Sequence, residues 1–144
     1  MLQLQDHEVF DILVGKVSGL INRTFLRAFA AEGLDITTEQ WTVMACLWKK
    51  DKVTQQTLCN ITAKDKPSMT RLIDKLEKRN FVTRVSDPND RRINLIHLTD
   101  AGITLQHKAT ELVQNIATKS LRNITDDELN VCRVVLRKIM ENLK

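Results

Sequence analysis

The 144-residue sequence predicts a mainly α-helical fold with one small β-hairpin. Only four glycines and two prolines interrupt the chain, which favours long helices. Over most of its length, apolar residues recur every three to four positions, as on the buried face of a helix. Residues 81–98 instead alternate apolar and polar side chains on both sides of a Pro-Asn turn, which is typical of two antiparallel strands.

Composition is that of a globular protein large enough to bury a core within one domain. The chain is 42% apolar and 28% charged, as in an ordinary soluble domain. No apolar run reaches the roughly 18–20 residues that span a bilayer, and the acidic N-terminus lacks a secretion signal, so we expect a cytoplasmic protein. Cys46, Cys59 and Cys132 are too widely spaced for a zinc site or a disulfide framework, and we interpret them as small packing residues. No cofactor is implied.

The first two helices have clear ends in the sequence. Helical spacing of apolar residues runs from Val9 to Phe29, and Gly33 then suits the left-handed position that ends a helix. Thr37 and Gln40 form a capping box, in which each side chain bonds the other residue's backbone N–H. This box predicts the start of a second helix.

Two shorter helices follow. Thr54 is a suitable cap for a helix over residues 55–61, and Val53 before it is an isolated apolar residue. Pro67 fits the first turn of the next helix, which buries four apolar residues between positions 69 and 76. Asn80 can take the left-handed conformation after that helix.

The hairpin and two more helices complete the chain. Strands over 81–85 and 93–98 flank a turn at 86–90. Thr99 can cap the next helix, and Thr125 with Glu128 forms a capping box for the last one. Apolar residues of that last helix are spaced 3, 4, 3 and 4 positions apart, which predicts a packing seam.

Positive charge is concentrated in one segment. Residues 64–92 hold nine Lys and Arg against five Asp and Glu, and this excess of four equals the net charge of the whole chain. The segment consists of one predicted helix and the hairpin that follows it. Two short helices followed by a two-stranded wing form a winged helix-turn-helix, whose second helix enters the major groove of DNA. The sequence therefore predicts binding to double-stranded DNA.

Two stretches resemble MarR-family transcriptional regulators. Residues 87–102 (DPNDRRINLIHLTDAG) are similar to the wing signature of that family, and residues 69–82 resemble its recognition helix. The resemblance covers essentially the whole chain. It implies a homodimer in which the first helix and the last two intertwine, and which binds a pseudo-palindromic operator, most often as a repressor. About 1–33 and 103–144 would then be dimerisation helices, and about 37–102 the DNA-binding lobe of a single domain 1–144.

The expected DNA contacts lie on the recognition helix and the wing. Ser68, Thr70 and Arg71 would reach base edges, whereas Lys75 would meet phosphates. The resemblance implies that Asp90 holds the wing and that Arg92 enters the minor groove, with Arg91 on a phosphate. The full set of expected contact residues is Lys64, Lys66, Pro67, Ser68, Thr70, Arg71, Lys75, Arg84, Asp90, Arg91 and Arg92.

Several residues have more than one interpretation. Asp74 could accept a hydrogen bond from a cytosine, but pairing with Arg71 or Lys78 is favoured. His97 is expected to face solvent or the partner lobe. Trp41 and Trp48, seven positions apart on one helix, either pack in the core or line a pocket for a small aromatic effector, which the resemblance places at the junction of the lobes.

The sequence departs from the family pattern in three respects. Asn80 stands where glycine is usual, and no cysteine near the N-terminus is available for peroxide sensing. His7, His97 and His107 are too scattered for zinc sensing. A winged-helix dimer that binds another protein instead of DNA is the alternative interpretation. An enzyme is not expected, because no nucleophile–base pair, phosphate loop or pair of matched carboxylates is present.

Overall fold

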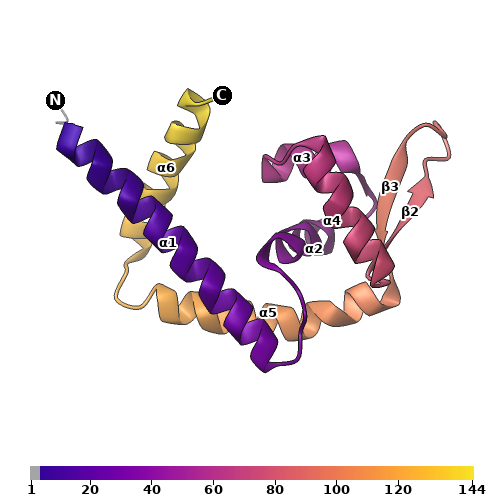
Figure 1. The fold of residues 1–144 in the computed structure, drawn as a ribbon, viewed down its shortest axis with the longest axis horizontal. Coiled ribbons are helices and arrows are strands. Elements are labelled where there is room, and N and C mark those ends of the chain that lie inside the picture. The colour runs from indigo at the N-terminus through magenta and orange to yellow at the C-terminus, as the bar shows by residue number, and fades with distance from the viewer. Residues whose placement is uncertain (1–3) are drawn as a thin grey trace. The chain divides into compact units, whose positions relative to one another are not determined.

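The structure, a computed structural model, describes the backbone of residues 4–144 and the side chains from residue 10 onward, so the side chains of His7 and Val9 lie outside the described residues. The chain divides into two compact units, Met1–Val113 and Gln114–Lys144. The helices and strands, drawn in Figure 1, are α1 (Leu4–Ala31), α2 (Thr38–Lys49), β1 (Val53–Thr54), α3 (Gln55–Thr62), α4 (Lys66–Lys78), β2 (Val82–Ser86), β3 (Asn94–Leu98), α5 (Asp100–Ser120) and α6 (Asp126–Asn142). This order confirms the predicted mainly helical fold.

The core of the larger unit is built from the predicted apolar faces. All four apolar residues of α4 are buried, as their spacing predicts. They meet side chains from the end of α1, from α2, α3 and α5, and from the sheet. The core residues with no exposed surface are Phe29, Val43, Met44, Leu47, Leu58, Met69, Ile73, Leu76, Ile96 and Ala109. This core fixes α3 and α4 as a helix pair and leaves the polar face of α4 outside.

Helix ends follow the predicted caps. The hydroxyls of Thr37, Thr54 and Thr125 each accept a hydrogen bond from the backbone N–H three residues on, at 3.1, 3.1 and 3.2 Å. Gly33 and Asn80 both have the left-handed conformation, with φ of 70° and 61°. Asn therefore performs the role expected of glycine at the exit from α4.

The sheet has one strand more than the sequence predicts. β2 and β3 form the expected antiparallel hairpin, with Thr83 opposite His97, and β1 adds to the other side of β3. Val53, an isolated apolar residue by its sequence pattern, is buried in β1 opposite Ile96. A two-residue strand has no alternation that a sequence could reveal. It ties the start of α3 to the wing.

Apolar side chains remain exposed on one helix of each unit. On α1 they include Leu13, Val17, Leu20 and Ile21. Helix α6 buries none of its residues, and its exposed apolar side chains include Val131, Val134, Val135, Leu136 and Met140. Cys132 is also exposed on α6, so the packing interpretation was wrong for this cysteine within the chain, whereas Cys59 is buried as predicted. Among the described helices, none has the length and apolarity to cross a membrane.

Candidate nucleic-acid interface

The recognition helix α4 begins at a strong cap. The carboxylate of Asp65 accepts hydrogen bonds from the backbone N–H of Ser68 at 2.7 Å and from its hydroxyl at 3.0 Å. These bonds hold the pKa of the Asp65 carboxyl below its ordinary value. Pro67 lies in the first turn, where its missing N–H costs no hydrogen bond. The cap therefore defines where the outward face of α4 starts.

The outward face of α4 presents most of the helix residues expected to contact DNA. Lys66, Pro67, Arg71 and Lys75 are exposed, and Ser68 is half-buried. The Arg71 guanidinium lies 3.5 Å from the Ser68 hydroxyl, at the outer limit of a hydrogen bond. Arg71, Lys75 and the hydroxyl of Ser68 thus occupy one side of a short helix, as groove recognition requires.

Thr70 and Lys64 lie near this face but are engaged within the protein. The Thr70 hydroxyl donates to the backbone oxygen of Lys66 at 2.9 Å and accepts from the amide of Gln55 at 2.7 Å. This contact links α3 to α4 and fixes the angle between them. Lys64 forms a salt bridge with Glu39 at 3.4 Å, so its charge is partly balanced at the start of α2.

Asp74 pairs with neither of the residues that the sequence favoured. Its carboxylate accepts from the Arg84 guanidinium at 2.7 Å, and Glu77 accepts from the same guanidinium at 2.9 Å. The favoured interpretation, a pair with Arg71 or Lys78, was wrong because it considered only neighbours on the same helix. Strand β2 supplies a cation that no helical spacing could indicate.

The wing tip carries the next two expected contacts. Arg92 is 90% exposed and bonded to Asp90, whose carboxylate lies 3.1 Å from the Arg92 Nε. Arg91 beside it is exposed. The backbone N–H of Ile93 donates to the oxygen of Asp90 at 3.0 Å and closes the turn. The loop between β2 and β3 therefore presents two arginines on an internally bonded turn.

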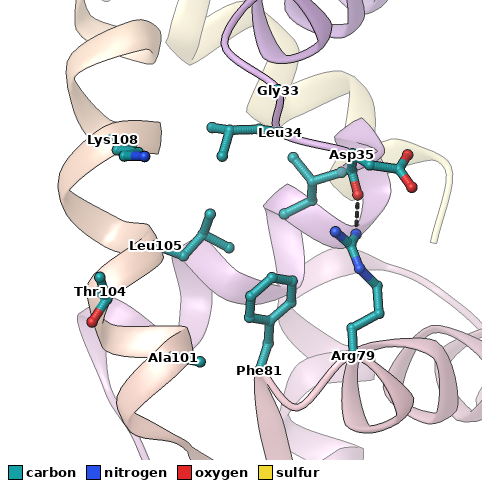
Figure 2. Close-up of a pocket in the computed structure, with 10 residues that line it drawn as sticks. Gly33, Leu34, Asp35, Arg79, Phe81, Ala101, Thr104, Leu105 and Lys108 are labelled. Carbon is teal, nitrogen blue, oxygen red and sulfur yellow. Dashed lines mark hydrogen bonds between the residues drawn. The ribbon is translucent and has the colours of Figure 1, made fainter.

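A cavity of about 370 Å³ lies at the exit from α4, as Figure 2 shows. Its wall is mainly apolar, with Arg79 and Lys108 as the cations. The Arg79 guanidinium donates to the backbone oxygen of Asp35 and stacks 4.9 Å from the centre of the Phe81 ring. The lining consists of Gly33, Leu34, Asp35, Ile36, Arg79, Phe81, Ala101, Thr104, Leu105 and Lys108. No sequence pattern indicated this set, which comes from three separate segments.

Neither tryptophan lines that cavity. The Trp41 and Trp48 rings pack with their centres 5.1 Å apart and their planes tilted by 59°, and the centre of the Trp41 ring lies 6.0 Å from that of Phe29. The Trp48 Nε1–H donates to the backbone oxygen of Gly102 at 2.9 Å. Both rings pack against the core, which agrees with the first of their two interpretations.

His97 does not face open solvent, which is the first of the two placements expected for it. Its side chain is half-buried, and the Nε2 atom is enclosed without a hydrogen-bond partner among the described residues. Because side chains alternate along β3, His97 and Ile96 lie on different faces of the sheet. Alternation alone could not show that the face of His97 is partly covered.

Comparison with known proteins places the chain in a family. The sequence profile of the MarR family matches residues 36–93. The multiple antibiotic resistance protein MarR of Escherichia coli K12 is 30% identical over 108 residues, which cover 74% of this chain and 75% of that protein. A crystal structure of a cysteine-to-serine mutant of E. coli MarR complexed with operator DNA is similar, with a TM-score of 0.83, 26% identity and coverage of 96% and 99% of the two chains.

A Staphylococcus aureus MepR–DNA complex shares the fold, with a TM-score of 0.83, 22% identity and coverage of 94% and 96% of the two chains. The recognition helix α4, strand β2 and the wing-tip arginines lie within the segment that the family profile matches, and β3 lies just beyond its end. The chain thus belongs to the MarR family of transcriptional regulators and is not an enzyme.

Proposed function

We propose that this protein is a homodimeric repressor that binds a specific, pseudo-palindromic site on double-stranded DNA in the cytoplasm. The observation that carries the proposal is the pairing of two cationic surfaces in one unit. The outward face of α4 holds Arg71 and Lys75, and the wing tip holds Arg91 and Arg92. Phosphates and groove edges of a duplex are the partners that such a combination suits.

The expected contacts divide by chemistry. Ser68 and Arg71 are suited to base edges in the major groove, because the first turns of a recognition helix lie deepest there. Lys66, Pro67 and Lys75 approach the sugar-phosphate backbone, and Lys64 contributes a partly balanced charge beside them. Thr70 supports the helix pair through Gln55. To donate to a base, the Thr70 hydroxyl would have to give up its bond to the backbone oxygen of Lys66.

On the wing, Arg92 enters the minor groove, where narrow A·T-rich segments concentrate negative potential. Asp90 orients Arg92, and Arg91 meets a phosphate on the flank. An operator with an A·T-rich segment outside each recognition half-site fits this arrangement.

Exposed apolar residues on α1 and α6 support the homodimer. A soluble chain rarely leaves this much apolar surface uncovered, and a second copy of the same chain would bury it. About 1–33 and 103–144 would form the dimer, and about 37–102 the DNA-binding lobe. Two identical lobes related by a twofold axis require an inverted repeat in the DNA.

An effector would act by favouring a dimer whose lobes do not match the operator spacing. Two positions are candidates for a small aromatic effector. One is the surroundings of Trp41 and Trp48, where the rings already pack against the core. The other is the cavity between Arg79 and Lys108, which combines an apolar wall with two cations and suits an aromatic carboxylate.

A thermal-shift screen of aromatic carboxylates tests the effector and its position together. A compound that raises Tm and releases DNA from the wild type should lose both effects in Lys108→Ala if it binds the cavity. It should lose them in Trp41→Leu if it binds beside the tryptophans. A panel with no shift at millimolar concentration removes the aromatic effector from the proposal.

Selection from genomic DNA tests DNA recognition. The purified protein is incubated with sheared DNA of its own genome at moderate salt, and the bound fragments are sequenced. Enrichment of a few fragments that share an inverted repeat supports the proposal. Uniform or absent recovery contradicts it and favours the alternative, a winged-helix dimer that binds another protein.

A further inference from the structure

An ionic cluster joins the recognition helix to the wing. Asp74 and Glu77 lie three positions apart on α4, so both carboxylates project from the same side of the helix. Arg84 on β2 donates through Nη2 to Asp74 at 2.7 Å and through Nη1 to Glu77 at 2.9 Å. The backbone N–H of Arg84 also donates to Glu77, at 2.9 Å. One residue of the wing is thus bonded three times to two acids of α4.

The Arg84 guanidinium has little capacity left for DNA. Each of its two terminal nitrogens donates to a carboxylate, and its side chain is only 22% exposed, compared with 90% for Arg92. The planar, forked guanidinium suits this task, because it can meet two carboxylates in fixed directions as lysine cannot. Its charge is therefore balanced inside the protein.

The location of the cluster gives it a consequence for recognition. Asp74 is 58% exposed on a helix that carries Arg71 and Lys75, so an unbalanced carboxylate there would repel phosphates. β2 is the strand that leads to the wing tip, and α4 and the wing would contact different segments of the duplex. A change in the angle between them would move Arg92 away from its groove while α4 stays in place.

We propose that Arg84 is a positioning residue that holds the wing at a fixed angle to the recognition helix and neutralises Asp74, and is not a phosphate contact. The inference rests on the proposed DNA-binding function and deepens it. It replaces our expectation that Arg84 contacts DNA. The geometry of the cluster would then fix the distance along the DNA between the major-groove contacts of α4 and the minor-groove contact of the wing.

A double-mutant cycle on operator DNA separates the two roles. If Arg84 positions the wing through Asp74, then Asp74→Asn and Arg84→Gln each lower the preference for operator over shuffled DNA, by about tenfold. The double variant has the same net charge as the wild type. Its preference for operator DNA should then be no lower than that of the single variant with the lower preference, because both changes break the same interaction. If Arg84 contacts phosphate and Asp74 only repels, Asp74→Asn raises affinity on any sequence and the two effects add.

A salt titration provides the matched control. Arg84→Gln leaves Asp74 unbalanced but loses no phosphate contact, so it should flatten the slope of log affinity against log salt by clearly less than the about 0.9 expected for loss of one phosphate contact. Arg91→Gln makes the same substitution at the wing tip, where no hydrogen bond of the described residues holds the side chain, and should flatten the slope. A slope flattened by about 0.9 in Arg84→Gln, as in Arg91→Gln, overturns the positioning role.

A measurement without DNA separates this inference from the proposed function. Amide hydrogen exchange over β2 and β3 should be several-fold faster in Arg84→Gln and in Glu77→Gln than in the wild type, and unchanged in Arg91→Gln. Unchanged exchange in Arg84→Gln overturns the inference even if the protein binds its operator. Faster exchange in a protein that binds no specific DNA would refute the proposed function and leave the positioning of the wing supported.

Discussion

Asp90 holds Arg92 by three hydrogen bonds to one carboxylate. The backbone N–H of Arg92 donates at 3.0 Å, its Nε at 3.1 Å and its Nη2 at 3.2 Å. These bonds hold the pKa of the Asp90 carboxyl below its ordinary value. Since one edge of the guanidinium is held by Asp90 while the side chain stays 90% exposed, the wing tip presents a cation whose direction is set before any partner arrives.

Arg92→Ala should lower affinity for the operator by about 1–3 kcal/mol, because a groove contact is lost. Fluorescence anisotropy with the recovered inverted repeat measures the change. Arg122→Ala is the matched control, since it removes an exposed arginine from the turn between α5 and α6, and it should bind as the wild type does. Equal affinity of Arg92→Ala and wild type would remove the wing from the interface.

Lys75→Ala should weaken binding to operator and shuffled DNA by the same factor, because a phosphate contact carries no sequence information. The slope of log affinity against log salt should fall by about 0.9. Titrations at four salt concentrations on both DNAs measure the two quantities. A change in sequence preference would show instead that Lys75 contacts a base.

Asp65 should make the free energy of unfolding fall at low pH. Its folded pKa is lowered by the bonds from Ser68, so the stabilisation is complete above the unfolded pKa of about 4 and is lost as the pH falls through the folded pKa. Asp65→Asn can still cap the helix but does not titrate, and it should lose less stability than the wild type in that range. The pKa values of Asp90 and Glu128 are lowered as well, so these two groups also reduce stability at low pH, but they are present in both the wild type and Asp65→Asn. Urea denaturation between pH 2.5 and 6 gives the comparison, and parallel curves would contradict it.

Gly102→Ala should destabilise the fold by about 1–3 kcal/mol, as overpacking does in a closed site. An added Cβ would lie 2.2 Å from the backbone oxygen of Phe81, which cannot move without shifting the start of β2. Urea denaturation measures the loss. Ala101→Ser changes the exposed neighbour on the same helix and should be nearly neutral. If both variants are equally stable, the approach of α5 to Phe81 is looser than the structure has it.

Charges placed on the exposed apolar faces should separate the dimer. Leu20 on α1 and Val131 on α6 are 57% and 63% exposed in the single chain. Leu20→Glu and Val131→Glu should sediment as monomers at micromolar concentration, because a buried unpaired carboxylate opposes association. Asn130→Glu, at the adjacent exposed position, should remain a dimer. Dimers in all three variants would place the interface elsewhere.

Local patterns in the sequence predicted the fold well. Caps at Thr37, Thr54 and Thr125 involve residues three positions apart, so the chain itself records where those helices begin. The strands observed differ from those predicted by about one residue at their ends. The strand at Val53 was missed because its partner Ile96 lies 43 positions further on, and no local pattern records such a pairing.

The site was less predictable, for the same reason. The polar face of α4 and the wing tip follow from helical spacing and from the wing signature. By contrast, the partner of Asp74 comes from β2, and the cavity combines the loop before α2 with Phe81 and α5. His97 belongs to this class, because alternation assigns a face of the sheet but not what covers that face. Tertiary packing alone brings these residues together.

The central claim is that the protein distinguishes one DNA sequence from others. The most direct test compares affinity for the recovered inverted repeat with affinity for a shuffled duplex of the same composition, at about 150 mM salt. Specific regulators bind their sites at least about 10³-fold more tightly than other DNA at such salt, and we predict a ratio of that size. Equal affinities for the two duplexes would contradict the claim, because charge attraction alone would then account for all of the binding.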